Sequence, residues 1–148
     1  MLGCIEEMLP HWRKQFEFHT LVINADNGPE CCGRRKQWLK RLIDFAGQHC
    51  ISIQLSYYPP YHSKYKSIER VWGAFENHWK GEILDSMDKA LGLVRSMTFR
   101  EISPTVRKVK KVYKKGVTLT GDALVKVEER LDRKKGLENW SIGIQPLP

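Results

Sequence analysis

The sequence predicts an α/β fold, and three observations point to it. The chain has 148 residues, of which 41% are hydrophobic, so it is long enough to bury a core as one domain. Residues 20–26 form an apolar run and residues 51–55 alternate between apolar and polar, and both patterns are typical of strands. Residues 34–48 have the period of an amphipathic helix. A strand, a helix and a strand in this order form a βαβ unit, so we expect the two strands to be parallel.

The N-terminal segment combines a helical pattern with a short strand. Apolar residues recur at three- and four-residue steps over residues 1–16, which predicts a helix that Pro10 would break or kink. Residues 20–26 form an apolar run, and the turn residues Asn27-Gly28-Pro29 follow it. This run predicts a buried strand with Asp26 at its C-terminal tip.

The helix predicted over residues 64–80 has the clearest pattern in the chain. We expect Trp72 and Phe75 to be core anchors that seat this helix on the sheet, and Glu69 lies in the first turn at the rim of the apolar stripe. The members of the stripe are Ile68, Val71, Trp72, Phe75 and Trp79.

Beyond residue 81 the patterns are weaker. They predict helices over 86–97 and 121–131 and a terminal strand over 140–144, whereas residues 105–119 mix Val and Lys in a way that separates neither strand from helix. We predict two domains, an α/β core at residues 1–81 with parallel strands and flanking helices, and a basic α+β C-terminal extension at residues 82–148.

The charge of the chain favours a polyanionic partner. There are 25 Lys and Arg against 17 Asp and Glu, a net charge of +8, and the excess is concentrated in residues 34–41 and 100–115. One such block usually forms a solvated face, but two of them in a basic chain favour nucleic acid. The side chains that we expect to contact DNA are Arg34, Arg35, Lys36, Lys64, Arg107, Lys108, Lys110 and Lys111.

Several other classes of protein are excluded. No apolar run approaches the length of a membrane span, and the first residues lack the basic-then-apolar pattern of a signal peptide. The cysteines form no CxxC pair, so we expect reduced thiols, no structural metal and a cytoplasmic location.

Asp26 and Glu69 are the candidate catalytic acids. Ligands of open α/β sheets lie outside the carboxyl ends of the strands, where Asp26 falls, and Glu69 could reach back over the sheet edge toward it. Carboxylates are hard oxygen ligands for Mg²⁺ or Mn²⁺, and such sites serve phosphoryl transfer. Each residue also has an alternative role, because Asp26 could cap a turn and Glu69 could be a first-turn glutamate favoured by the helix dipole.

Three strings resemble the C-terminal half of a bacterial insertion-sequence DDE transposase of the Rhodopirellula type, and the similarity runs from about residue 18 to the end. The strings are Ile23-Asn24-Ala25-Asp26-Asn27-Gly28-Pro29-Glu30, Tyr57-Tyr58-Pro59-Pro60-Tyr61-His62-Ser63-Lys64 and Ser67-Ile68-Glu69-Arg70-Val71-Trp72-Gly73. This resemblance implies a ribonuclease-H-like fold, here a partial one, in which three acids hold two divalent ions for DNA strand cleavage and joining. It implies that Asp26 is the second acid and Glu69 the third, and that the partners are transposon ends and target DNA.

The sequence departs from the family pattern in two ways. The family usually has Asn-Pro where this chain has Lys66 and Ser67, so we expect the helix cap to shift to Ser63 or Ser67, and Lys66 could compete with a metal ion for Glu69. No aspartate precedes Asp26, which predicts a truncated catalytic fragment, inactive alone, that depends on a missing N-terminal half or on a homo-oligomer. The alternatives are a non-catalytic DNA-binding remnant and a small structural or interaction protein.

Overall fold

The computed structural model describes residues 2–59, 66–108 and 121–146. The chain divides into two compact units, one formed by Met1–Pro60 with Lys111–Pro148 and the other by Tyr61–Lys110. Each unit is described by itself below. The predicted division into a core at residues 1–81 and an extension at residues 82–148 stays a prediction.

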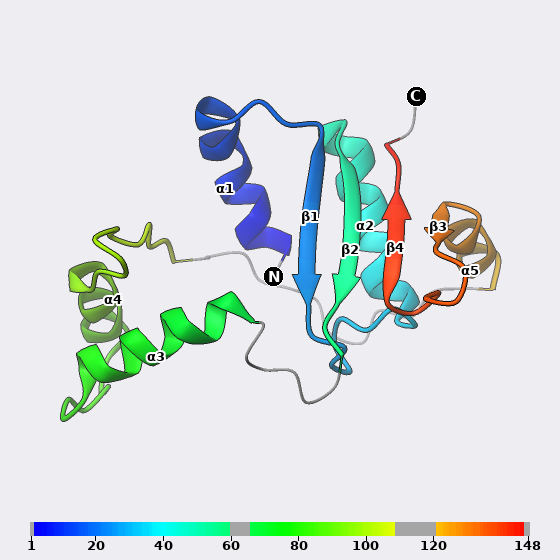
Figure 1. Cartoon of the computed structure of the whole chain (residues 1–148). Helices are drawn as coiled ribbons and strands as arrows, with labels where there is room; N and C mark the ends of the chain where they lie inside the picture. The colour runs from blue at the N-terminus through cyan, green and yellow to red at the C-terminus, as the bar shows by residue number, and fades with distance from the viewer. Residues whose placement is uncertain (1, 60–65, 109–120, 147–148) are drawn as a thin grey trace. The chain divides into compact units, whose positions relative to one another are not determined.

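The first unit contains a four-stranded mixed sheet, so the predicted α/β class is confirmed (Figure 1). The strands are β1 (Thr20–Ala25), β2 (Ser52–Tyr57), β3 (Leu131–Arg133) and β4 (Ser141–Ile144), in the order β1-β2-β4-β3. β1 and β2 are parallel as predicted, and Leu21 is paired with Ile53. β4 is the predicted terminal strand, and it runs antiparallel to β2 and to β3. The three-residue β3 is too short to produce a periodic signal and was not predicted.

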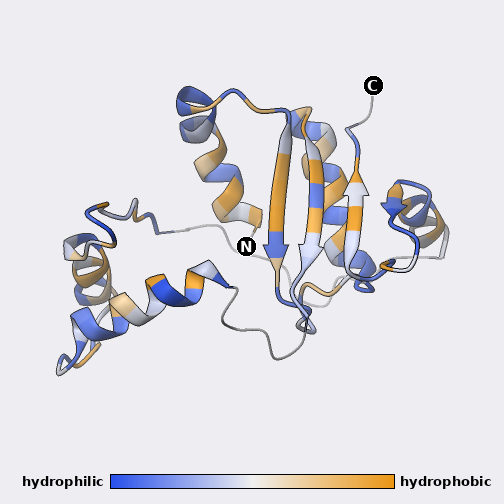
Figure 2. Ribbon diagram, in the orientation of Figure 1, coloured by the Kyte–Doolittle hydropathy of each residue, from blue (hydrophilic) through white to orange (hydrophobic). Residues whose placement is uncertain are grey.

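The connection between the parallel strands is α2 (Lys36–His49). Its buried face holds Trp38, Leu39, Leu42, Phe45 and Ala46, as the amphipathic pattern predicts. Along β1 and β2 the buried residues alternate with more exposed ones, so one face of the sheet packs on the helix layer. Figure 1 shows α2 behind β2 and β4, and Figure 2 shows hydrophobic residues concentrated in the strands.

The first helix, α1 (Leu2–Gln15), continues through Pro10, so the proline does not break it. A proline inside a helix removes one hydrogen bond and costs roughly 3 kcal/mol or more. Packing offsets this cost, because the adjacent Leu9 is only 2% exposed and belongs to the same core cluster as the sheet. The remaining helix of the unit, α5 (Gly121–Glu128), begins where the sequence predicts a short helix.

The second unit contains α3 (Ser67–Trp79) and α4 (Met87–Ser96), which the sequence predicts as helices over 64–80 and 86–97. α4 has a capping serine, since the Ser86 hydroxyl oxygen accepts a hydrogen bond from the backbone N–H of Lys89 at 3.2 Å. Residues 105–108 are described and form neither helix nor strand, whereas the rest of 105–119 lies outside the described residues. None of the helices in the described ranges is both long and apolar enough to cross a bilayer.

Two expectations for α3 are wrong. Its N-cap is Lys66, with Ser67 already in the first turn and no side-chain capping bond, while Ser63 lies outside the described residues. Trp72 is 57% exposed and therefore is not a core anchor, whereas Phe75 is buried. The only other helix in the described part of this unit is the ten-residue α4, and beside it Ile68 and Trp72 of the apolar stripe remain exposed.

Candidate functional site

Asp26 follows directly after the last residue of β1, at the carboxyl end of a parallel strand, as predicted. The end of the strand is fixed, because Ala25 is buried and its carbonyl oxygen accepts a hydrogen bond from the backbone N–H of Tyr58 at 3.1 Å. Asp26 itself is exposed. The fold therefore presents a carboxylate at the sheet edge where ligands of open α/β sheets bind.

The segment that follows, residues 26–35, is called the Asp26 loop here. The Cys31 thiol donates a hydrogen bond to the backbone carbonyl oxygen of Asp26 at 3.0 Å, and the Cys31 N–H bonds to the Gly28 carbonyl oxygen at 3.2 Å. Burial raises the pKa of the Cys31 thiol, so at neutral pH the thiol keeps the proton that it donates. All four cysteines are free, as the sequence predicts.

Tyr57, the last residue of β2, reaches the same loop. Its hydroxyl group donates a hydrogen bond to the carbonyl oxygen of Cys31 at 2.5 Å and accepts one from the indole Nε1–H of Trp38 at 3.3 Å. Tyr57 is buried, and this burial raises its pKa to about 12. The sequence analysis named Tyr57 only as the first residue of a family-like string, so its contact with the loop was missed.

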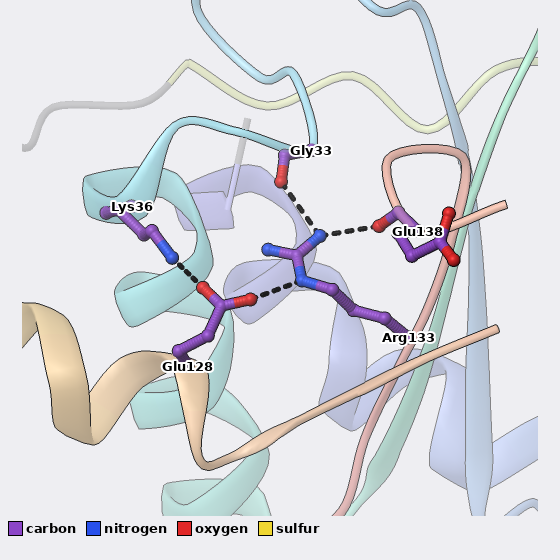
Figure 3. A network of polar contacts seen from close by, with 5 residues as sticks. All are labelled: Gly33, Lys36, Glu128, Arg133 and Glu138. Atoms are coloured by element: carbon purple, nitrogen blue, oxygen red, sulfur yellow. Dashed lines mark hydrogen bonds and ion pairs between the residues drawn. The ribbon is translucent and has the colours of Figure 1, made fainter. Parts of the chain in front are cut away.

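The C-terminal segment, which here means the residues that follow α5, contacts the Asp26 loop through Arg133 of β3, as Figure 3 shows. The Arg133 guanidinium donates from Nη1 to the carbonyl oxygen of Gly33 at 3.2 Å and to that of Glu138 at 2.6 Å. Its Nε donates to one carboxylate oxygen of Glu128, and the other oxygen is paired with the Lys36 ammonium group. Burial lowers the pKa of Arg133, and burial together with the Arg133 charge lowers the pKa of Lys36. One carboxylate thus holds two cations from different elements, a contact that no local sequence pattern signals.

The predicted DNA-binding side chains differ in their surroundings. Arg35 is turned into its own loop, where it donates to the Pro29 carbonyl oxygen at 3.0 Å and pairs with Glu30 at 3.4 Å. Lys36 is paired with Glu128. Arg34, Arg107 and Lys108 are exposed, whereas Lys64, Lys110 and Lys111 lie outside the described residues. The expectation that these side chains contact DNA stays a prediction.

Glu69 lies in the first turn of α3, in the second unit, and its side chain is 45% exposed. The lysine contact suspected from the sequence is present, since Lys66 Nζ lies 3.5 Å from Glu69 Oε1. Asp26 and Glu69 belong to different units, so their joint role stays a prediction.

The two acids fit a divalent ion in the kind of donor that they offer. Both are carboxylates with exposed side chains, and Mg²⁺ and Mn²⁺ prefer such oxygen ligands. Next to Asp26, the Oδ1 atom of Asn27 is shielded from solvent and accepts no hydrogen bond within the part of the chain that the structure describes. Over residues 2–59, 66–108 and 121–146, no three His, Cys, Asp or Glu side chains form a metal-binding group.

Comparison with known proteins decides the family. A family model for the Rhodopirellula transposase DDE domain matches residues 7–146. The chain belongs to this family. Searches of curated proteins and of solved structures find no significant match. The match confirms the resemblance and identifies the chain as a transposase DDE domain, from a family that typically uses divalent metal ions and acts on DNA.

Proposed function

We propose that this DDE domain takes part in DNA transposition by metal-dependent cleavage and joining of DNA strands, on a ribonuclease-H-like fold. The observation that carries the proposal is the family match over residues 7–146. The position of Asp26 at the carboxyl end of β1 supports it, because open α/β sheets bind their ligands at that edge.

We assign Asp26 and Glu69 as the second and third acids of the DDE set. Their carboxylates would hold Mg²⁺ or Mn²⁺, with phosphate oxygens of DNA completing the ligand shell. When bound, such ions activate the attacking hydroxyl group and neutralise charge on the phosphate and the leaving oxygen. The exposed cations Arg34, Arg107 and Lys108 hold the DNA backbone by charge. We place this activity in the bacterial cytoplasm, where the DNA is.

We further propose that the 148-residue chain does not cleave DNA by itself. Two ions bring a charge of +4, and Asp26 and Glu69 supply two negative charges, so a further acid is required. We propose that this acid is supplied by association with another polypeptide.

β1 suits such an association. It is an edge strand of the sheet, it carries no charged residue, and Val22 on it is 57% exposed. An uncharged edge without proline or a bulge pairs readily with another strand.

A non-catalytic DNA-binding protein is the second candidate. The observation that favours it is the pairing of Lys66 with Glu69 at 3.5 Å, because a bound ion would have to displace this lysine. The two candidates differ in metal dependence, since only the first requires carboxylates that bind an ion.

DNA binding tests what the two candidates share. We expect the chain to bind duplex DNA with little sequence preference, and the affinity to fall by about 10³-fold between 50 and 200 mM salt if about six phosphate contacts form. Combined replacement of Arg34, Arg107 and Lys108 by Gln lowers the salt dependence, whereas a triple replacement of Lys40, Arg130 and Lys134 by Gln serves as a charge-matched control. No binding at low salt contradicts both candidates.

A supercoiled-plasmid assay with Mg²⁺ or Mn²⁺ tests the catalytic proposal. We expect no nicking by the chain alone, and nicking once a polypeptide that supplies the first acid is added. The Asp26→Asn and Glu69→Gln proteins should lose this activity, and Asp132→Asn and Glu76→Gln, which change exposed acids in the same two units, should keep it. Nicking that survives both Asp26→Asn and Glu69→Gln would refute the assignment of the acids.

A further inference from the structure

The Asp26 loop is held by side chains that bind its backbone carbonyl oxygens. The oxygen of Asp26 accepts a bond from the Cys31 thiol, that of Cys31 from the Tyr57 hydroxyl, and that of Gly33 from the Arg133 guanidinium. These three bonds tie the backbone of the loop to the protein rather than to water. Here the donors come from within the loop, from β2 and from β3.

Tyr57 forms the middle of a hydrogen-bonded chain that ends at Asp26. The Trp38 indole donates to the Tyr57 hydroxyl at 3.3 Å, and this hydroxyl donates to the Cys31 carbonyl oxygen at 2.5 Å. The side chain of Cys31 then donates to the Asp26 carbonyl oxygen at 3.0 Å. Trp38 and Tyr57 are both buried, so the chain connects the rigid core to the backbone of the exposed acid.

Arg133 fixes the other end of the loop. It bonds to the Gly33 carbonyl oxygen at 3.2 Å, and Glu128 and the Glu138 carbonyl oxygen hold the guanidinium in place. At this point the loop and the C-terminal segment are in close contact, because a Cβ atom on Gly33 would lie 2.5 Å from the carbonyl oxygen of Asn139. The residues that follow α5 therefore pack directly on the Asp26 loop.

We propose that Tyr57 and Arg133 are positioning residues for Asp26, and that the C-terminal strands β3 and β4 thereby belong to the working acid site. This inference rests on the proposed function, because it takes Asp26 to be a metal ligand. Neither side chain needs to touch the ion. They hold the backbone from which the Asp26 carboxylate projects, so the affinity for the ion depends on them.

The test compares Tyr57→Phe with Tyr58→Phe in the full 148-residue chain. Both variants lose one hydroxyl group on neighbouring residues, and the bond from the tyrosine hydroxyl to the Cys31 carbonyl oxygen is lost in Tyr57→Phe. Two quantities are measured for each: amide hydrogen exchange across the Asp26 loop, and Mn²⁺ affinity from paramagnetic broadening of the amide signals near Asp26.

For Tyr57→Phe we expect amide exchange at Cys31 and Cys32 to rise, and Mn²⁺ affinity to fall, by about threefold to tenfold, the range expected for one lost hydrogen bond. Exchange in β2 and β4 should not change. Tyr58→Phe should match the wild type in both measurements. Arg133→Lys, which keeps the charge but replaces the planar guanidinium group by a single ammonium nitrogen, should loosen the loop at Gly33 and lower Mn²⁺ affinity to a similar extent.

Two results would overturn the proposal. One is unchanged loop exchange in Tyr57→Phe, and the other is faster loop exchange with unchanged Mn²⁺ affinity, which would make Tyr57 a purely structural residue. The Asp26→Asn protein separates the proposal from the function on which it rests. If Asp26→Asn binds Mn²⁺ as well as the wild type, the assignment of Asp26 is wrong, whatever the exchange data show for the loop.

Discussion

The two units support their candidate acids in different ways. In the first unit, Asp26 follows a buried strand, and hydrogen bonds from Cys31, Tyr57 and Arg133 hold the loop that begins with it. In the second unit, Glu69 lies in the first turn of a helix that has no side-chain capping bond, and Lys66 lies 3.5 Å from its carboxylate. A shared family match therefore does not imply equal preorganisation, since side-chain hydrogen bonds hold the backbone that carries Asp26, whereas Glu69 lies in an uncapped helical turn.

Apolar side chains are also more completely buried in the first unit than in α3 of the second unit. Leu39, Leu42, Leu55 and Ile142 of the first unit are completely buried, whereas Ile68 and Trp72 of α3 are 53% and 57% exposed. Burial of apolar surface is the main favourable term in folding. We therefore expect the first unit to be the more stable one, and the following predictions test that comparison.

The largest effect is expected for Leu55→Ala in β2. Its side chain is 0% exposed in the middle of the core, and replacing a buried leucine by alanine lowers the free energy of unfolding by about 2–5 kcal/mol. Val22→Ala, on the exposed side of β1, should cost much less. Urea unfolding followed by circular dichroism measures both, and equal costs would show that the exposed face of β1 is covered in solution.

Gly33→Ala tests the contact between the Asp26 loop and the C-terminal segment. The added methyl group would lie 2.5 Å from the Asn139 carbonyl oxygen, so the backbone must shift at a cost of about 1–3 kcal/mol. At Gly28 a methyl group would meet nothing within 4 Å, and Gly28→Ala should leave the unfolding free energy almost unchanged. If the two variants unfold at the same urea concentration, the loop does not pack on the segment.

The pH dependence of stability tests the burial of Tyr57. Its pKa is raised to about 12 in the folded protein, so the unfolded tyrosine ionises first, near pH 10. The neutral phenol therefore contributes stability that is fully present below pH 10 and is lost as the pH rises toward 12, by about 2 kcal/mol. Tyr57→Phe should lose less stability than the wild type over that interval. Identical alkaline profiles for the two proteins would contradict the burial of this hydroxyl.

The smallest effect is expected for Trp72→Ala in α3. Because the indole is 57% exposed, its removal should cost less than about 1 kcal/mol, whereas a buried tryptophan costs about 3–5 kcal/mol. Phe75→Ala, at the buried position of the same helix, should cost more. Thermal unfolding of the two variants ranks them, and the reverse order would show that the exposed stripe of α3 is covered in solution.

Local patterns predicted much of the fold. The apolar run at β1, the alternation at β2 and the amphipathic period of α2 each depend on residues that are close in sequence, and the structure confirms all three. β3 was missed because three residues carry no period. The exposure of Trp72 was missed because a helical period shows that an apolar stripe exists and not how much of it another element covers.

Some residues of the candidate site were also predicted from the sequence, and others could not be. Asp26 and Glu69 were predicted from their places at a strand end and in a first helical turn, and their carboxylates remain assignments under the proposed function. Tyr57 and Arg133 could not be predicted, because their partners are backbone carbonyl oxygens. Every residue carries the same backbone carbonyl group, so no side-chain pattern indicates which of these groups will accept a bond.

The most direct test of the account is whether Asp26 and Glu69 bind one ion. Mn²⁺ is titrated into the isotope-labelled 148-residue chain, and paramagnetic broadening is followed at the amides next to both acids. We predict that the amide signals next to Asp26 and next to Glu69 broaden with one apparent affinity for Mn²⁺. In Asp26→Asn and in Glu69→Gln, neither set of signals should broaden. Asp132→Asn should behave as the wild type. Broadening near Asp26 that persists unchanged in Glu69→Gln would contradict the account, because the two carboxylates would then not share an ion.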